Sequence, residues 1–242
     1  MKLFFSFTTV PQQVISQSTT YDNMQMVLQW APTFCGRNNC NNPVPQSFTL
    51  HGLWPANSTG NVLHLQRVLV CNLYICMYLQ WTTDRQLRTA LQKCWYSLIR
   101  GRPDYILWKH EWSYHGYCSS QTIKDTGYFW AAVLKYGKNI TIAGKEIVNK
   151  LQISAGISPS NDKVYKKIAI TSALSKILGF NNQVDAVYIS CTAKNTTHDI
   201  LHEIFFCLDK MLGNFIPCPP SPDTRGCDGE DKSSKIIIPT KV

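Results

Sequence analysis

The pattern of apolar and polar positions predicts strands toward both ends of the chain. Residues 21–30 and 46–51 mix or alternate apolar and polar side chains, as strands with one buried face do. Residues 184–191 and 200–208 are two further strand-like runs. Residues 35–45 are rich in Asn and Pro, which predicts a loop between the first two strands.

Helical patterns occupy the middle of the chain, over residues 84–99, 104–114, 126–136 and 162–178. The last is the clearest, because Asn161 or Asp162 can cap its start and Gly179 can end it. Strands that bracket a helical middle predict a single α+β domain over residues 21–242. Within its last stretch, only residues 236–239 are expected to be held against the fold.

Residues 1–20 begin like a secretory signal peptide, with Lys2 followed by an apolar run. The run is short and no A-x-A cleavage site follows it. We interpret residues 1–20 as an incomplete signal peptide or a disordered N-terminal extension. No stretch approaches the roughly 20 apolar residues that span a bilayer, so no membrane partner is expected.

The ten cysteines indicate an oxidising compartment. None forms a C-x-x-C pair, which disfavours a zinc ribbon. Three N-x-S/T sequons, at Asn57, Asn139 and Asn195, agree with the secretory route. We expect a secreted, extracellular, disulfide-bonded glycoprotein. Its formal net charge of +9 attracts polyanions, although the Lys and Arg residues are too scattered to single out nucleic acid.

Two segments contain candidate catalytic histidines. His51 lies in F-T-L-H-G-L-W-P, at the end of a predicted strand, where a lone histidine is more often a satisfied core residue. The second segment is W-K-H-E-W-S-Y-H-G-Y-C. On a helix its His110, Glu111, Tyr114 and His115 fall within an arc of about 140°. Two imidazoles and a carboxylate therefore share one helix face.

Two other chemistries fit these residues poorly. The zinc motif H-E-x-x-H needs its second histidine at i+4, but that position is Tyr114 and His115 comes one residue late. A nucleophilic triad lacks a G-x-S-x-G serine, and the cysteines are better used as disulfides. We expect neither a metal nor another cofactor.

Paired acid–base catalysis by two histidines remains, and single-stranded RNA suits it because RNA carries its own nucleophile, the 2′-hydroxyl. One imidazole removes the hydroxyl proton and the other protonates the leaving 5′-oxygen, which yields a 2′,3′-cyclic phosphate. An unperturbed pKa near 6.5 keeps both forms of histidine populated at mild pH. DNA would bind without being cut.

The two histidine segments resemble the active-site segments of the RNase T2 family, in their order and separation. The resemblance extends over residues 21–239 and is strongest to the plant S-RNases of self-incompatibility, which are typically basic glycoproteins. It implies an antiparallel sheet packed with helices. It also implies that His115 is the general base, His51 the general acid and His110 a phosphate ligand, with Glu111 orienting groups around it. Trp54 is implied as a base-stacking platform, and Gln29 as a contact to a second base.

The resemblance further implies the disulfides Cys35–Cys40, Cys71–Cys118, Cys191–Cys227 and Cys207–Cys218. It leaves open whether Cys76 and Cys94 form a fifth bond. Residues 57–81 fall where S-RNases vary between alleles, with Asn57 as a glycan site. If the chain is an S-RNase, its partners would include pollen F-box proteins; we expect a monomer.

One position departs from the family pattern, because Tyr114 stands where lysine is usual. A lost contact to the transition state costs on the order of 2–4 kcal/mol. The alternatives are therefore a catalytically weakened RNA-binding glycoprotein of the same fold, or tolerance of the change. A defence or nutrient-recycling ribonuclease also stays open. A defence protein that acts on membranes has only its charge in its favour.

Overall fold

The protein is described here from a computed structural model. It describes residues 20–64, 84–137, 144–180, 186–193, 198–219, 226–227 and 235–240, to which all structural statements refer. Its strands are β1 (Asn23–Trp30), β2 (Phe48–Ala56), β3 (Tyr165–Lys166), β4 (Val187–Ala193), β5 (Asp199–Asp209), β6 (Phe215–Ile216) and β7 (Lys235–Ile237). Its helices are α1 (Ala31–Cys35), α3 (Arg85–Cys94), α4 (Asp104–Tyr114), the 3-10 helix η2 (Gly116–Ser119), α5 (Asp125–Gly137), α6 (Gly144–Ala155) and α7 (Lys167–Ile177).

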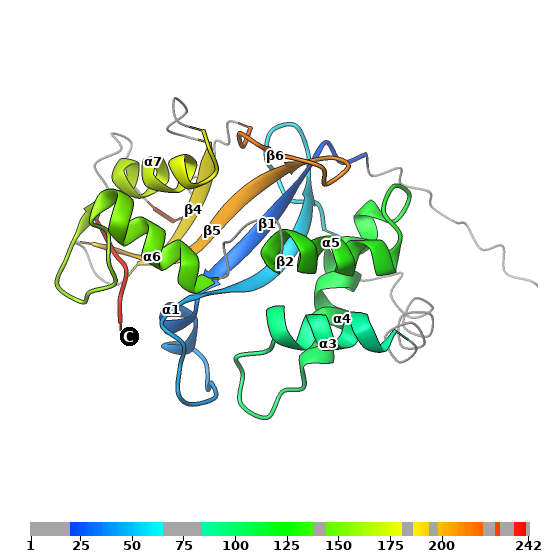
Figure 1. Cartoon of the computed structure of the whole chain (residues 1–242), viewed down its shortest axis with the longest axis horizontal. Coiled ribbons are helices and arrows are strands. Elements are labelled where there is room, and N and C mark those ends of the chain that lie inside the picture. The colour runs from blue at the N-terminus through cyan, green and yellow to red at the C-terminus, as the bar shows by residue number, and fades with distance from the viewer. Residues whose placement is uncertain are drawn as a thin grey trace, which may run out of the picture.

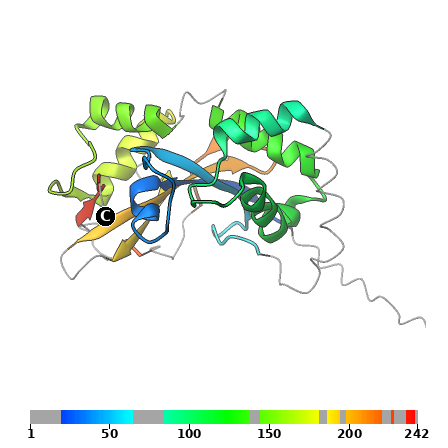
Figure 2. The ribbon, with the colours of Figure 1, turned by 90° about the horizontal axis from the view of Figure 1, so that it is seen from below.

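These strands form one sheet around β1 and β5. β1 pairs with β2 on one side and β5 on the other, and β5 also pairs with β4 and β6. The predicted α+β class is confirmed, and every strand pair is antiparallel except β5 with β7, which is parallel. Figures 1 and 2 place α6 and α7 over one end of this sheet and α3, α4 and α5 toward the other.

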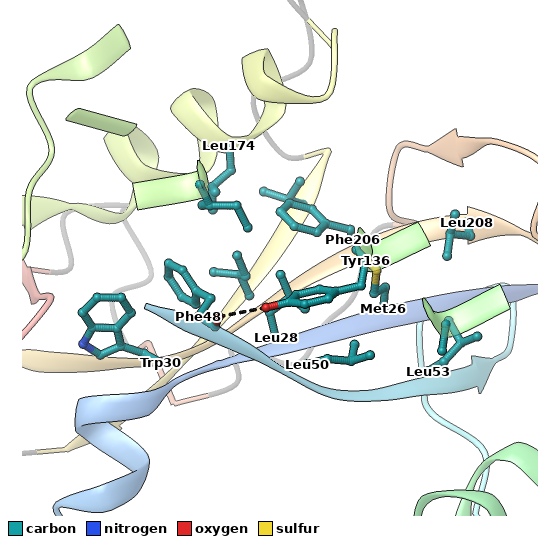
Figure 3. Close-up of a cluster of buried hydrophobic side chains, with 14 of the residues drawn as sticks. Met26, Leu28, Trp30, Phe48, Leu50, Leu53, Tyr136, Leu174, Phe206 and Leu208 are labelled. Atoms are coloured by element: carbon teal, nitrogen blue, oxygen red, sulfur yellow. Dashed lines mark hydrogen bonds between the residues drawn. The ribbon is translucent and has the colours of Figure 1, made fainter. Parts of the chain in front are cut away.

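The hydrophobic core lies between one face of the sheet and these helices. β1 contributes every second residue, Met24, Met26, Leu28 and Trp30, all with no exposed surface. Figure 3 shows side chains of β2 and β5 beside them, with Tyr136 of α5 donating its hydroxyl hydrogen to the Phe48 carbonyl oxygen at 3.1 Å. The opposite face of β1, which carries the candidate site, presents Asn23, Gln25, Val27 and Gln29.

α6 approaches the sheet more closely than any side chain at its start would permit. A Cβ on Gly144 would lie 1.6 Å from the Phe48 carbonyl oxygen, so the first residue of α6 must be glycine. This helix was not predicted from the sequence, and its buried Ile147 and Leu151 hold it against the core.

The four predicted strands and the helix over residues 104–114 are present, but three bounds were wrong. The strand expected to end at His51 continues to Ala56, because residues 52–56 stay paired with β1. The helix expected over residues 84–99 ends at Cys94, because the buried Trp95 leaves the helical conformation and donates its indole hydrogen to the carbonyl of His51. The helix expected from Asp162 begins only at Lys167, because Tyr165 and Lys166 pair with β7 instead. Asn161 does not cap it but accepts a hydrogen bond from the Thr240 amide at 3.0 Å.

The chain near residues 236–239 is held against the fold, as expected. β7 pairs with β3 and β5, and the Pro239 carbonyl accepts the Trp30 indole hydrogen at 2.8 Å. Gly179, at φ +85°, ends α7 as predicted. None of the helices among the described residues has the length and apolar character needed to cross a membrane. Residues 1–19, which hold nearly all of the proposed signal segment, lie outside the described residues.

Candidate active site

β2 presents His51 at an irregularity in its pairing with β1. The register shifts between Val27 and Leu28, which leaves His51 without an opposite residue on β1. Its backbone carbonyl is held by the Trp95 indole at 2.8 Å, and its side chain is 27% exposed. A rigid strand therefore carries an imidazole that solvent and substrate can reach.

α4 places its four candidate residues in two different environments. Glu111 is fully buried, and His115, which caps the helix, is 5% exposed. His110 and Tyr114 lie on the exposed side, where their rings stack at a centroid distance of 5.5 Å and an angle of 14°. The predicted shared face thus divides into an inner pair and an outer pair.

Trp54 connects the two segments. Its Nε1 donates to Glu111 Oε2 at 2.7 Å, and its ring stacks on His115 at 4.5 Å between centroids. The same indole meets the His51 ring edge-on at 5.0 Å. Both candidate catalytic imidazoles therefore lie against one indole, with the Glu111 carboxylate between the strand and the helix.

Sequence reasoning missed Glu203, which lies on β5 and contacts His51. Its Oε1 is 2.6 Å from His51 Nδ1, and its Oε2 accepts from the Ser190 hydroxyl at 3.1 Å. Glu203 is only 7% exposed. A single acidic residue inside the apolar run I-L-H-E-I-F-F was the available signal, because a buried carboxylate requires a partner.

Sequence reasoning also missed His64, which lies at the rim of the site. Its ring is 4.9 Å from that of His115 and 5.0 Å from that of Tyr114. With His110, these side chains form a row of aromatic rings beside the buried His115. Tyr114 is therefore packed against its neighbours at the position where lysine was expected.

Gln29 lies in the sheet beside Glu203, its register partner on β5, with Thr49 opposite it on β2. Gln29 is 4% exposed, and its Oε1 has no hydrogen-bond partner among the described residues. Its predicted contact to a base stays a prediction.

The two imidazoles have opposite pKa shifts. Burial by itself lowers the pKa of His51, but the charge of Glu111 and the hydrogen bond and charge of Glu203 outweigh it and raise the pKa to about 9. Burial, together with the nearby His64 and His51, lowers the pKa of His115 to about 3. Near neutral pH the site thus holds one protonated and one neutral imidazole.

The two carboxyl groups beside His51 also differ. Burial raises the pKa of Glu111, despite the opposing effects of His51 and the Trp54 hydrogen bond. For Glu203 the hydrogen bond and charge of His51 outweigh burial and lower the pKa. Burial lowers the pKa of His110 as well, with smaller effects in the same direction from His51 and Arg102.

Three of the four implied disulfides are present in the structure: Cys35–Cys40, Cys191–Cys227 and Cys207–Cys218. Cys71 and Cys76 lie outside the described residues, so the Cys71–Cys118 bond stays a prediction. Cys94 and Cys118 form no disulfide with another described cysteine. Among the sequons, Asn57 is half-buried in the loop after β2, and Asn139 and Asn195 lie outside the described residues.

The sheet and the segment around α4 bring two histidines with opposite pKa shifts against one indole, which defines a candidate active site. Comparison with known proteins identifies the family. The Ribonuclease T2 family matches residues 21–218, so the chain belongs to this family of ribonucleases. Ribonuclease 3 of Arabidopsis thaliana is 31% identical over 242 residues, covering 96% of this chain and 99% of that protein.

Similarity to S-RNases is also found, as the sequence predicted. Ribonuclease S-1 of Pyrus pyrifolia is 29% identical over 213 residues, with 86% of each chain covered. The crystal structure of the SF11-RNase, associated with gametophytic self-incompatibility in Nicotiana alata, superposes with a TM-score of 0.67 at 24% identity. The superposition covers 91% of this chain and 100% of the SF11-RNase chain, and it shows that the two proteins share a fold.

Proposed function

We propose that this protein is a secreted endoribonuclease that cuts single-stranded RNA by metal-free transesterification. One observation carries the proposal: His51 and His115 lie against the same indole with opposite pKa shifts. A neutral imidazole is a base and a protonated one is an acid, so the pair starts the reaction in the required states.

In the proposed reaction His115 removes the proton of the 2′-hydroxyl. The 2′-oxygen then bonds to phosphorus, and the bond from phosphorus to the 5′-oxygen breaks. His51 gives its proton to that leaving oxygen. The products are a 2′,3′-cyclic phosphate and a free 5′-hydroxyl, and atoms and charge balance without a metal ion or other cofactor.

The other residues are assigned supporting roles. His110, on the exposed side of α4, is proposed to hold the phosphate, and the buried Glu111 to orient Trp54 and polarise groups around phosphorus. Trp54 is half-buried, so part of its surface stays open for stacking on a base. Gln29 is proposed as a contact to a second base, although its burial makes it the weaker candidate of the two.

An RNA digestion in EDTA at mildly acid pH tests this proposal, with wild type, His51→Ala, His115→Ala and a DNA of the same sequence as control. We expect wild type to cut RNA but not DNA, and each variant to be slower by roughly 10²–10⁴-fold. If wild type cuts RNA no faster than His115→Ala, the proposed ribonuclease activity is refuted. Activity lost in EDTA would indicate a metal site instead.

For the biological role we propose an S-RNase acting in gametophytic self-incompatibility, which would meet pollen F-box proteins and act as a monomer. The similarity to S-1 of Pyrus pyrifolia and the net charge of +9 support this role, and disulfides support secretion. Expression confined to the style is the expected result. Stress-induced expression in leaves would favour a defence or nutrient-recycling role.

The second candidate function is an RNA-binding glycoprotein with little turnover. Tyr114 favours it, because a tyrosine supplies no charge where lysine is usual. RNA retained by the protein without detectable cleavage would support this candidate.

A further inference from the structure

Glu203 is a buried carboxylate that the proposed reaction does not use. It lies on β5, and its register partners are Gln29 on β1 and Ser190 on β4. The sheet therefore fixes the backbone of Glu203 from both sides. Because the backbone of Glu203 is fixed and its side chain contacts His51, Glu203 can fix the orientation of the His51 ring.

We propose that Glu203 is a positioning residue that holds the His51 ring in one orientation, with Nδ1 toward the sheet and Nε2 toward the substrate. The inference rests on the proposed role of His51 as general acid. It adds a residue to the machinery that touches neither RNA nor phosphorus.

The distances distinguish the two carboxylates that face His51. Glu203 Oε1 lies 2.6 Å from Nδ1, a charge-assisted hydrogen bond, whereas Glu111 Oε1 lies 3.7 Å from Nε2, too far for one. Nδ1 is thus occupied and Nε2 remains available. The hydrogen bond that Nδ1 makes keeps the proton of that nitrogen in place, so the protonated ring donates its proton from Nε2.

The charges support the same division. His51 lowers the pKa of Glu203, so that carboxylate stays ionised beside the imidazole, whereas burial raises the pKa of Glu111. The Ser190 hydroxyl donates to the second oxygen of Glu203 at 3.1 Å, which fixes the carboxylate plane. Three other titratable groups face His51, whose charge lowers their pKa values: His202 on β5, His110 on α4 and His115 at the end of α4.

The test compares wild type, Glu203→Gln and Glu203→Asp, with Glu146→Gln on α6 as a charge-matched control outside the site. Nitrogen-15 NMR, assigned with His51→Gln, follows the tautomer and pKa of His51 without requiring turnover. The rate of RNA cleavage against pH is measured on the same samples.

In Glu203→Gln we expect the pKa of His51 to fall by more than one unit, and the alkaline limb of kcat/KM to move down with it. At neutral pH kcat should fall by roughly 10–10⁴-fold, because the imidazole loses the carboxylate that fixes its orientation and tautomer. KM should stay within about twofold, because Glu203 does not touch substrate. Glu203→Asp should restore part of the pKa, and Glu146→Gln should match wild type.

An unchanged His51 pKa and pH profile in Glu203→Gln would overturn the inference. If that variant does not fold, wild type decides, because above the His51 pKa the inference requires the neutral ring to carry its proton on Nδ1. A proton on Nε2 would refute it. A wild type that shows the pair by NMR but cuts no RNA would refute the proposed function and leave the pair standing.

Discussion

The Trp54 indole donates its hydrogen to the Glu111 carboxylate at 2.7 Å, and this bond joins β2 to α4 at the centre of the site. Glu111 has no exposed surface, so no water replaces a lost donor. Trp54→Phe should therefore lower the free energy of unfolding by about 1–3 kcal/mol. It should also reduce kcat, because the stacked His115 loses its fixed neighbour.

Trp30→Phe is the matched control. Its indole also donates a buried hydrogen bond, at 2.8 Å to the Pro239 carbonyl, but it lies away from the histidines. Urea unfolding should show a comparable loss of stability in both variants, while activity well below the melting temperature should fall only in Trp54→Phe. Equal kcat for wild type and Trp54→Phe would contradict the role given to this contact.

Gly52 leaves no room for a side chain beside that hydrogen bond. A Cβ there would lie 2.2 Å from both Glu111 Oε2 and Trp54 Nε1. Gly52→Ala should lower stability by about 1–3 kcal/mol, the usual cost of overpacking, and displace Trp54. Gly127→Ala on α5 is the control, because its Cβ would meet Ile123 at an ordinary 3.7 Å and alanine favours a helix. A Gly52→Ala enzyme with wild-type activity would show that the contact tolerates displacement.

The pKa values of His51 and His115 predict a broad bell for kcat/KM against pH. Activity should fall below about pH 3, where His115 becomes protonated, and above about pH 9, where His51 loses its proton. Between these limits the free enzyme holds base and acid in the required forms. The rate of cleavage of a dinucleotide at low substrate concentration, measured against pH, gives this profile. An alkaline limb that did not change in a His51 variant, or an acid limb that did not change in a His115 variant, would contradict this assignment.

The same pKa values predict how stability depends on pH. The raised pKa of His51 stabilises the fold fully below about pH 6.5, the unfolded value, and this contribution is lost as pH rises toward 9. The lowered pKa of His115 costs stability as pH falls from about 6.5 toward 3. Urea titrations should show His51→Gln losing the alkaline slope and His115→Gln losing the acid slope.

Much of the fold was predictable because its signals are local. The helix over residues 104–114 was predicted with the bounds that α4 has, and it brings Glu111 and His115 together. The early end of α3 was not predictable, because it depends on the Trp95 side chain reaching the distant His51 carbonyl. Tertiary contacts of this kind override a helical pattern.

The site was predictable only in part for the same reason. His51, Trp54, Glu111 and His115 belong to two recognisable segments, and the structure brings them together. Glu203 lies 152 residues from His51 in sequence, and only the pairing of β5 with β1 places it at Nδ1. His64 belongs to neither of the two recognisable segments, so only its ring contact with His115 in the structure places it at the site.

Tyr114→Lys should raise kcat, by tenfold or more, because an ammonium near the phosphorane supplies charge that tyrosine lacks. The substitution also removes the ring contacts to His64, His110 and His115. Each contact contributes roughly 0.5–1.5 kcal/mol to the packing that holds this residue in place, so their loss opposes the gain in kcat. Tyr114→Phe is the control, since it keeps the ring without adding charge. An unchanged or lower rate in Tyr114→Lys would show that Tyr114 is not a defect.

The central claim is that His115, as base, and His51, as acid, catalyse transfer of the phosphoryl group from the 5′-oxygen to the 2′-oxygen. Phosphorus-31 NMR of a dinucleotide incubated with the protein in EDTA tests this most directly. We predict a 2′,3′-cyclic phosphate as the first product, formed by wild type and not detectably by His115→Ala. A 5′-phosphate, or a 3′-phosphate formed with no cyclic intermediate, would contradict it.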